Sequence, residues 1–503
     1  MCRKDNKYGE EGITKASTRA CHYIYTYLYI YSLVAIGDTN NVLAGSIQDF
    51  YADSKILVTG ATGFIGKALI EKLLRSCTQV STIFMLIRPK KGLNSQIRHD
   101  KLLDSSIFDT IRDQNPELLK KLVTVEGDVA QENLGLSEAD RKKLVEEIDV
   151  VFHSAATVRF TEKLKDAIEL NTLGTIKVIE LCREMKNLKA FVHVSTAYSN
   201  AEKYEVLETV YPAPCDLEQL KACCRDPIDK KKEKKLVGKH PNNYTMTKAV
   251  SEYVVSTQAS DLPVAIVRPS IVTGAWKEPV PGWVDNVSGI SGIMVEISRG
   301  TLRSIICDEK CVMDVIPVDI VVNTLIAAAW HTARHRSITV PVYNCTSGTL
   351  NPISWYNYGR LTEKYCLQVP SKYVQWYPGF SFTTNRFRHS IIELFMHFLP
   401  ALFIDLIMVL NGMKPIMFEI AKKFKKACKN GEFFALHEWK FQCDNLVALN
   451  KAISAENDKD TFSVDIAKIE WDSYVRNYLM GLRKFVLKDD PETLAGARKK
   501  LHR

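Results

Sequence analysis

Short apolar runs alternate with amphipathic segments between residues 55 and 275. Six runs have the length and composition of buried strands: 55–60, 82–88, 123–128, 149–155, 190–195 and 264–269. Residues 66–77, which follow the first run, have apolar side chains at helical spacing. Strands that are apolar along their whole length are typical of parallel sheets with both faces covered. The pattern therefore predicts an α/β fold with a doubly wound parallel sheet.

The most apolar stretch of the chain, residues 391–410, lies well beyond this region. It is long enough to cross a bilayer. It also contains four residues that are costly in lipid, namely Glu393, His397, Pro400 and Asp405. Two interpretations stay open: a membrane-inserted hairpin or interfacial helix, and a pair of buried helices. The lysine-rich segment 422–429 follows closely and suits anionic headgroups.

Residues 1–45 differ in pattern from the rest of the chain. Tyrosine occupies every second position from Tyr23 to Tyr31, which is typical of a strand rather than a helix. We expect this extension to be disordered or an artefact of gene prediction. We divide the remainder into a sheet domain, residues 46–370, and a mostly helical domain, residues 371–503, which contains the apolar stretch.

Composition and charge restrict the class of partner. Of the 503 residues, 46% are hydrophobic and 25% charged, as in ordinary globular proteins. The formal net charge of +9 favours anionic partners, but no basic-aromatic module indicates nucleic acid. The insertion at 211–240 contains the run KKKEKK and is expected to be a solvated surface loop. The 13 scattered cysteines predict free thiols in a reducing compartment and no metal site.

The sequence TGATGFIG, residues 59–66, directly follows the first predicted strand and opens the next helix. Gly60 permits a tight turn, Gly63 lets the backbone approach a pyrophosphate, and Gly66 allows close packing of helix and strand. In this context the motif predicts a Rossmann-type dinucleotide-binding sheet. The predicted cofactor-binding residues of the loop are Thr59, Gly60, Thr62, Gly63, Phe64, Ile65 and Gly66.

The ends of the next two strands indicate which dinucleotide binds. A protein that binds NAD would place an acid at the end of the second strand. This chain has Arg88 there, followed by Lys90 and Lys91. Because a cation suits a 2′-phosphate, NADPH is the predicted cofactor. Asp128 ends the third strand, where its carboxylate could accept a hydrogen bond from the adenine amino group.

Two later segments carry side chains that suit carbonyl reduction. Tyr244 and Lys248, in YTMTK, are four residues apart and would share one face of a helix. A tyrosine is a proton donor at neutral pH, and we expect Lys248 to lower its pKa. Ser195 and Thr196 close the strand in HVSTAY, and the Thr196 hydroxyl could hold a carbonyl oxygen as negative charge develops. With a nicotinamide cofactor, these groups predict a reductase.

The motifs occur in the order found in extended short-chain dehydrogenase/reductases. The stretches VFHSAATVRF, ELNTLGT, VHVSTAYSN, YTMTKAVSE and PGWVDN most closely resemble the alcohol-forming fatty acyl-CoA reductases of the insect type. HFLPALFIDL, NGMKP and EWKF resemble that family's second domain, called the male-sterility domain. The combination is far more specific than any single motif.

The resemblance implies a role for each matching residue. It implies five catalytic side chains: Tyr244, Lys248, Thr196, Ser195 as the less favoured alternative to Thr196, and Asn171, which would support the lysine and a water. It implies that the cofactor contacts Ala155, Pro269, Ile271, Tyr244 and Lys248. The loop at 281–286 is expected on the substrate side.

The implied reaction converts a fatty acyl-CoA into a primary alcohol with two NADPH, with release of CoA and a bound aldehyde. An enzyme of this type would face the cytosol on an intracellular membrane, the endoplasmic reticulum or the peroxisome, and its attachment would rest on residues 391–410. Three alternatives stay open: reduction of another lipid or sterol carbonyl, release of the aldehyde after one hydride, and NADPH binding without turnover. Chain-length preference and oligomeric state are not predicted.

Overall fold

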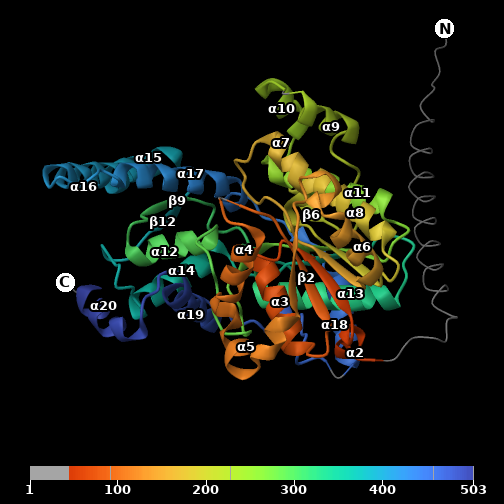
Figure 1. Ribbon diagram of the computed structural model, residues 1–503. Coiled ribbons are helices and arrows are strands. Elements are labelled where there is room, and N and C mark those ends of the chain that lie inside the picture. Colours follow the sequence, from red (N-terminus) through yellow and green to blue (C-terminus); the bar gives the residue numbers. More distant parts are fainter. Residues whose placement is uncertain (1–44, 91, 227, 457, 502–503) are drawn as a thin grey trace, which may run out of the picture. The chain divides into compact units, whose positions relative to one another are not determined.

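The computed structural model describes residues 45–90, 92–226, 228–456 and 458–501. The predicted extension therefore lies outside the described residues, except for Gly45. From Gly45 onward the chain packs as one compact unit. Its described residues form one large sheet, three two-stranded sheets and the helices around them (Figure 1).

Seven parallel strands form the large sheet in the order β11-β7-β5-β4-β1-β2-β3. Their bounds are β1 (Lys55–Thr59), β2 (Thr82–Ile87), β3 (Leu122–Glu126), β4 (Val150–His153), β5 (Ala190–Val194), β7 (Val264–Pro269) and β11 (Val342–Cys345). The strand order reverses between β1 and β4. In such sheets the crevice beside the carboxyl ends at this point binds the ligand. The prediction of a doubly wound, Rossmann-type α/β fold is confirmed.

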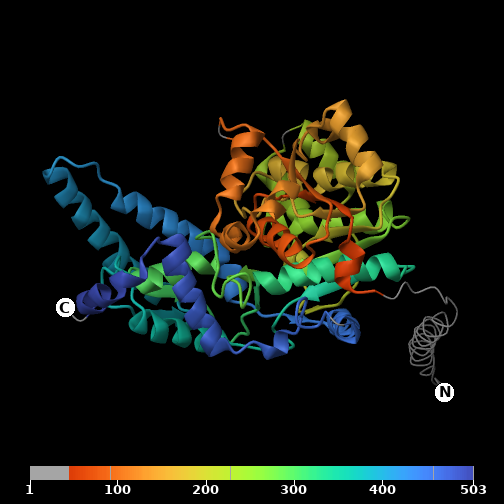
Figure 2. The same ribbon diagram turned by 60° about the horizontal axis from the view of Figure 1, so that its bottom comes forward.

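Helices cover both faces of this sheet (Figures 1 and 2). The helices before residue 370 are α2 (Ile47–Tyr51), α3 (Phe64–Ser76), α4 (Ser95–Leu103), α5 (Asp109–Gln114), α6 (Glu138–Glu147), α7 (Leu164–Ala167), α8 (Gly174–Glu184), α9 (Leu217–Arg225), α10 (Lys230–Val237), α11 (Asn243–Gln258), α12 (Ile290–Arg299), α13 (Val318–Arg334) and α14 (Trp355–Gln368). Ile56 and Val58 of β1 belong to the core that contains α3 and α13. Leu57, between them, belongs to the core with α8 and α11, as the pleat of a strand requires.

The insertion at 211–240 contains two short helices, α9 and α10, and is not the loop that we predicted. Each helix begins at an aspartate whose carboxylate accepts a backbone N–H of the first turn, 2.9 Å for Asp216 and Gln219 and 2.8 Å for Asp229 and Lys232. Such caps stabilise a helix start. The lysines of α10 are nevertheless exposed, as expected for a solvated surface.

The chain after residue 370 is mostly helical. Its helices are α15 (Arg386–Glu393), α16 (Leu399–Leu410), α17 (Met417–Ala435), α18 (Asp444–Ala455), α19 (Trp471–Gly481) and α20 (Leu494–Leu501). The small sheets pair β8 (Ile271–Thr273) with β10 (Val315–Pro317), β9 (Ser304–Ile306) with β12 (Ser381–Thr383), and β6 (Glu205–Val206) with β13 (Lys440–Phe441). Strands β12 and β13 thus pair with strands of the preceding part. The domain boundary near residue 370 stays a prediction.

The apolar stretch forms an arm that projects from the body of this unit (Figures 1 and 2). Helix α15 continues through a π-helical turn, η6 (Leu394–Phe398), into α16, and α17 returns beside α16. Among the described residues, Arg386–Leu410 is the one helix long and apolar enough to cross a membrane, and only 17% of its apolar window is buried. The interpretation as a pair of buried helices is therefore wrong.

Candidate active site

The loop after β1 lies very close to two other parts of the backbone. Gly60 has a φ of +76°, and a Cβ there would lie 2.8 Å from the amide nitrogen of Ala155. A Cβ on Gly66 would lie 2.3 Å from the carbonyl oxygen of Gly60. Only glycine fits such positions. Helix α3 starts at Phe64, so its free N–H groups lie beside the switch point and suit a pyrophosphate.

Three charged side chains lie beside this loop. The Arg88 guanidinium, predicted to bind a 2′-phosphate, forms an ion pair with Asp128 at 3.1 Å, so two separately predicted residues come together. Arg98 on α4, which the sequence reasoning missed, donates to Thr62 Oγ1 at 2.8 Å and to the carbonyl of Arg88. Burial lowers the pKa of Arg98, with a further contribution from Arg88, but a guanidinium stays charged. The loop is therefore flanked by two cations.

A buried histidine, also missed, joins the glycine loop to the next part of the site. Thr175 donates its hydroxyl proton to the carbonyl of Asn171 at 2.6 Å, so it must accept from His153 Nε2–H, 3.1 Å away. His153 Nδ1 then accepts from Thr59 Oγ1 at 2.8 Å, and Thr59 accepts the N–H of Ala155 at 3.2 Å. Burial, with a smaller contribution from Lys248, lowers the pKa of His153 to about 3, so the ring is neutral and its tautomer is fixed.

Asn171 lies fully buried in a π-helical turn, η4 (Ile168–Leu173), a type of irregularity frequent at functional sites. Its side-chain oxygen accepts the N–H of Thr157 at 2.8 Å, and its side-chain nitrogen donates to Thr247 Oγ1 at 3.0 Å. Thr247 directly precedes Lys248 on α11. In the structure Asn171 therefore supports Lys248 through the neighbouring residue and does not contact it directly.

The Lys248 side chain is buried against the end of β5. Its Nζ donates to the carbonyl of Val194 at 2.7 Å and lies 3.2 Å from Nε2 of His193, which serves as acceptor. Burial lowers the pKa of Lys248 to about 8, although Glu252 opposes the shift. Burial also lowers the pKa of His193 well below its usual value, so His193 is neutral. Two acceptors on β5 thus hold the ammonium beside α11.

Tyr244 lies one turn before Lys248, close enough to the Thr196 hydroxyl for that group to lower the pKa of Tyr244. Ser195 instead donates to Glu252 at 2.5 Å, and Glu252 forms a buried ion pair with Arg268 at 2.7 Å. The two adjacent hydroxyls therefore belong to different networks. Thr196, and not Ser195, therefore lies beside Tyr244.

The pKa of Tyr244 shifts in the direction opposite to the one that we expected from Lys248. Burial raises it to about 12, and the Thr196 hydroxyl opposes this rise only in part. The physical reason is desolvation, which disfavours the charged phenolate more than the neighbouring groups favour it. Tyr244 is therefore protonated at neutral pH, as a proton donor must be.

Aromatic rings from both parts of the chain form a connected cluster that begins at Tyr244. Phe160 stacks on Tyr244 with ring centroids 6.0 Å apart, and Phe434 of α17 lies 5.3 Å from Phe160. Tyr198 packs edge-on against Phe434 at 5.0 Å and against Trp439 at 5.1 Å. The sequence reasoning missed this apolar wall, because its members are far apart in the chain. An aliphatic substrate suits such a wall.

The other predicted residues lie along the same crevice or behind it. Pro269 ends β7, and its carbonyl oxygen lies 3.5 Å from Thr196 Oγ1. Ile271 starts β8, next in the chain. The loop at 281–286, expected on the substrate side, contacts the start of α3. There Trp283 stacks on Phe64 at 5.3 Å.

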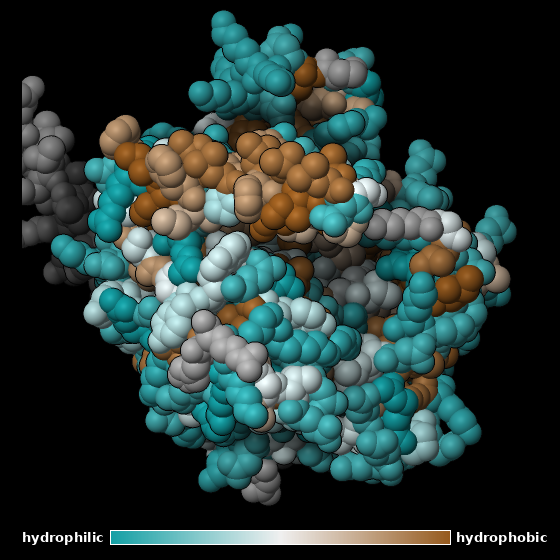
Figure 3. Space-filling model, turned by 90° about the vertical axis from the view of Figure 1, so that its left-hand side faces the viewer, coloured by the Kyte–Doolittle hydropathy of each residue, from teal (hydrophilic) through white to brown (hydrophobic). Residues whose placement is uncertain are grey.

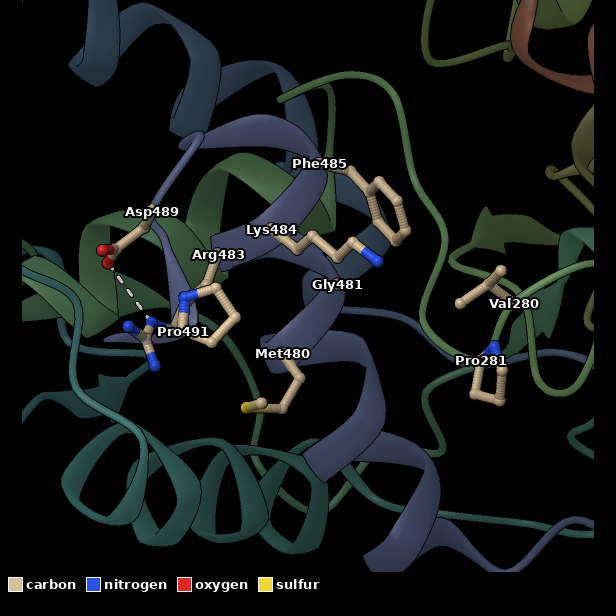
Figure 4. Close-up of a pocket in the computed structure, with 9 residues that line it drawn as sticks. All are labelled: Val280, Pro281, Met480, Gly481, Arg483, Lys484, Phe485, Asp489 and Pro491. Atoms are coloured by element: carbon tan, nitrogen blue, oxygen red, sulfur yellow. Dashed lines mark hydrogen bonds and ion pairs between the residues drawn. The ribbon is translucent and has the colours of Figure 1, made fainter. Parts of the chain in front are cut away.

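A small pocket lies elsewhere, between Val280–Pro281 and the C-terminal part (Figure 4). Its other lining residues are Met480, Gly481, Arg483, Lys484, Phe485, Asp489 and Pro491. Arg483 is paired with Asp489 at 3.2 Å, and of the residues expected at the site only Pro281, the first residue of the loop at 281–286, lines the pocket. It is therefore separate from the candidate active site.

The glycine loop at the switch point and the Thr196–Tyr244 pair beside Lys248 define a Rossmann-type reductase that uses a nicotinamide cofactor. Two family models, both described as male sterility protein, match residues 58–325 and 396–489. Rat fatty acyl-CoA reductase 1 is 40% identical over 461 residues, which cover 91% of this chain and 89% of the relative. Mouse fatty acyl-CoA reductase 2 is 37% identical over 460 residues, again covering 91% and 89%. The chain belongs to the fatty acyl-CoA reductase family, as its motifs predict.

Solved structures agree on the fold. The reductase domain of a nonribosomal peptide synthetase from Mycobacterium tuberculosis covers 88% of this chain and 93% of its own length, with a TM-score of 0.58 and 20% identity. The terminal reductase domain of the myxalamid biosynthetic pathway covers 87% and 92%, with a TM-score of 0.56 and 20% identity. At this identity the likeness concerns the fold alone.

Proposed function

We propose that this protein reduces fatty acyl-CoA to a primary fatty alcohol with two NADPH, releasing CoA and keeping the aldehyde bound in between. The observation that carries the proposal is the placement of the Tyr244 phenol and the Thr196 hydroxyl together beside the buried Lys248. This arrangement supplies a proton and an oxyanion contact at one place. The 40% identity to rat fatty acyl-CoA reductase 1 supports the substrate class.

Each residue of this arrangement has a defined task in the proposed reaction. The nicotinamide, when bound, supplies one hydride to the carbonyl carbon in each of the two reductions. Thr196 donates a hydrogen bond to the carbonyl oxygen as it gains negative charge. After the first reduction the C–S bond breaks and CoA leaves as the thiolate. In the second reduction, Tyr244 donates its proton to the alcohol oxygen. The Lys248 ammonium stabilises the phenolate that remains.

The proposed cofactor is NADPH rather than NADH. The tight approaches at Gly60 and Gly66 fit a dinucleotide, and the guanidinium groups of Arg88 and Arg98 suit a 2′-phosphate. Hydrogen bonds to charged groups contribute about 1.5–3 kcal/mol. Arg98→Gln should therefore raise the Kd for NADPH at least about tenfold and leave the Kd for NADH nearly unchanged. Fluorescence titration measures both, with Arg141→Gln, a partly exposed arginine on α6 that pairs with Glu184, as the control. An equal increase in the Kd values for NADPH and NADH would contradict this assignment.

Product analysis tests the reaction. The full chain is supplied with NADPH and a panel of long-chain acyl-CoAs, and lipids are extracted. We expect fatty alcohol, with two NADPH oxidised for each CoA released. Aldehyde as the end product would indicate a one-hydride enzyme. Cofactor binding without product would favour another lipid or sterol carbonyl, or a role without turnover.

The proposal extends to domain organisation and location. Residues 46–370 would carry the reduction, and residues 371–503 would complete the apolar wall. The enzyme would work on the cytosolic face of an intracellular membrane, the endoplasmic reticulum or the peroxisome. The apolar helix Arg386–Leu410 supports this location. Fractionation of cells with organelle markers tests it, and recovery of the protein in the soluble fraction would contradict it.

A further inference from the structure

The outer face of the arm is apolar and exposed. Most of the large apolar side chains that are exposed in the described residues lie on α15, η6, α16 and the turn after them. On η6 and α16 they are Leu394, Phe395, Met396, Leu399, Leu402, Phe403, Leu406, Ile407, Val409 and Leu410. They gather into one brown area on the side of the molecule that carries the arm (Figure 3). A patch of this kind marks an interaction surface.

Three polar residues of this apolar stretch, Glu393, His397 and Asp405, have partners inside the arm or at its base. The Asp405 carboxylate accepts the N–H groups of Ile416, Met417 and Phe418 at 2.8–2.9 Å and so caps α17 across the turn. Glu393 forms an ion pair with Lys425 at 2.6 Å. His397 Nε2 accepts the N–H of Arg303 at 3.2 Å. The residues that are costly in lipid are therefore satisfied within the protein, which leaves the outer face apolar.

Helix α17 adds positive charge beside this face. Five exposed lysines lie on it: Lys422, Lys423, Lys425, Lys426 and Lys429. Two acidic residues, Glu419 and Glu432, lie on the same helix and pair with Lys422 and Arg386. The arm thus combines an apolar face with a net positive charge, as interfacial helices do.

We propose that the arm docks on an acidic lipid surface, with the outer face of η6 and α16 in the boundary between headgroups and acyl chains. The lysines of α17 lie at the level of the anionic headgroups. The hairpin does not cross the bilayer, because α17 packs along α16 and a spanning α16 would carry several charges into the hydrocarbon. Self-association of two arms is disfavoured, because a two-fold contact brings two identical lysine sets together.

Vesicle flotation of the full chain, without substrate or cofactor, tests the proposal independently of activity. Vesicles of phosphatidylcholine alone are compared with vesicles that also contain phosphatidylserine. We expect the chain to float with both and more strongly with the acidic vesicles. The triple variant Leu402→Asn, Phe403→Asn, Leu406→Asn should lose binding to both. The triple variant Lys422→Gln, Lys423→Gln, Lys426→Gln should lose only the preference for acidic vesicles. Its affinity for acidic vesicles should fall about fivefold per lysine.

The control is the triple variant Lys230→Gln, Lys231→Gln, Lys232→Gln, which removes the same charge from exposed positions on α10 and should float like wild type. Thermal unfolding midpoints verify that every variant is folded. Wild-type chain that stays unbound, equal binding by the apolar triple variant, or an equal loss in the α10 variant overturns the proposal. A vesicle-free dimer that the apolar triple variant converts to monomer, with vesicle binding intact, would instead identify a second copy as the occupant.

Discussion

Ser195 and Thr196 are adjacent in the chain but point into different networks. Successive side chains of an extended segment point to opposite sides. Ser195 therefore reaches Glu252, and Glu252 holds the fully buried Arg268. Thr196 reaches Tyr244. One hydroxyl thus belongs to a buried structural network and the other to the proposed site of reduction.

Alanine substitutions should separate these two roles. Thr196→Ala should lower kcat by about 10²–10³-fold, with the Kd for NADPH unchanged, and Thr196→Ser should restore much of the rate. Ser195→Ala should leave kcat within a few-fold but reduce the free energy of unfolding by about 1–3 kcal/mol, because the Glu252 carboxylate loses a buried donor. Steady-state kinetics and denaturant unfolding measure the two effects. The reverse pattern would exchange the roles of the two residues.

The pKa of Lys248 gives the activity a defined pH dependence. The folded pKa is about 8, below the ordinary value of a lysine. Lys248 is therefore cationic below about pH 8 and neutral above it, and kcat/KM for NADPH should fall as the pH rises through about 8. The pKa values of Tyr244, about 12, and His153, about 3, lie too far away to cause this fall. A profile that stays flat to about pH 10 would contradict the assignment.

The lowered pKa of Lys248 also affects stability, but stability changes with pH in the direction opposite to kcat/KM. Between about pH 8 and the ordinary lysine pKa, the unfolded chain binds more protons than the folded chain at this position. The contribution of Lys248 to the free energy of unfolding therefore increases with pH across that window.

Short motifs made some site residues predictable and left others undetected. Tyr244, Lys248 and Thr196 stand in local patterns whose spacing carries meaning. Arg98 and His193 are single residues, and their positions depend on how α4 and β5 pack. Sequence spacing alone cannot give such contacts.

At the scale of elements, the arm explains why an apolar segment carries acidic residues. Asp405 lies in the middle of the most apolar stretch, yet it is the cap of the next helix. From the sequence alone, this carboxylate is only a group that is costly to place in lipid. Its function depends on the turn that brings α17 back to α16, and a pattern read along one helix does not contain this information.

Removal of this cap should loosen the tip of the arm. Asp405→Ala deletes the acceptor of three backbone N–H groups and should cost about 1–2 kcal/mol of local stability. We expect faster hydrogen exchange of the amides at 416–418, by roughly tenfold. The control is Glu419→Ala, an exposed residue in the same turn, which should change exchange little. Unchanged exchange in Asp405→Ala would show that the turn does not depend on the carboxylate.

Other elements show the same limit of sequence patterns. Six of the seven sheet strands stand out as apolar runs, because both faces of the sheet are covered. The seventh, β11, has four residues and ends in Asn344 and Cys345, so no long apolar run announces it. Each of the two helices in the insertion begins at a single aspartate cap. In the sequence such a cap is a weaker signal for a helix than the lysine run is for a solvated loop.

At the scale of the whole molecule, the C-terminal part contributes aromatic rings beside Tyr244. Phe434, at the end of α17, packs on Phe160, which stacks on Tyr244. Two short sheets join the same part to the reductase fold. The arm that we propose to lie on lipid is thus continuous with the wall of the proposed active site, which suits an enzyme whose substrate and product are lipids.

In the proposed reaction, two hydrides reach the same carbon. The most direct test supplies the full chain with a long-chain acyl-CoA and NADPH deuterated at the transferred position of the nicotinamide, followed by mass spectrometry of the lipid product. We predict a primary alcohol with two deuterium atoms on C1. An aldehyde with a single deuterium as the end product, or a product without deuterium, would contradict the account.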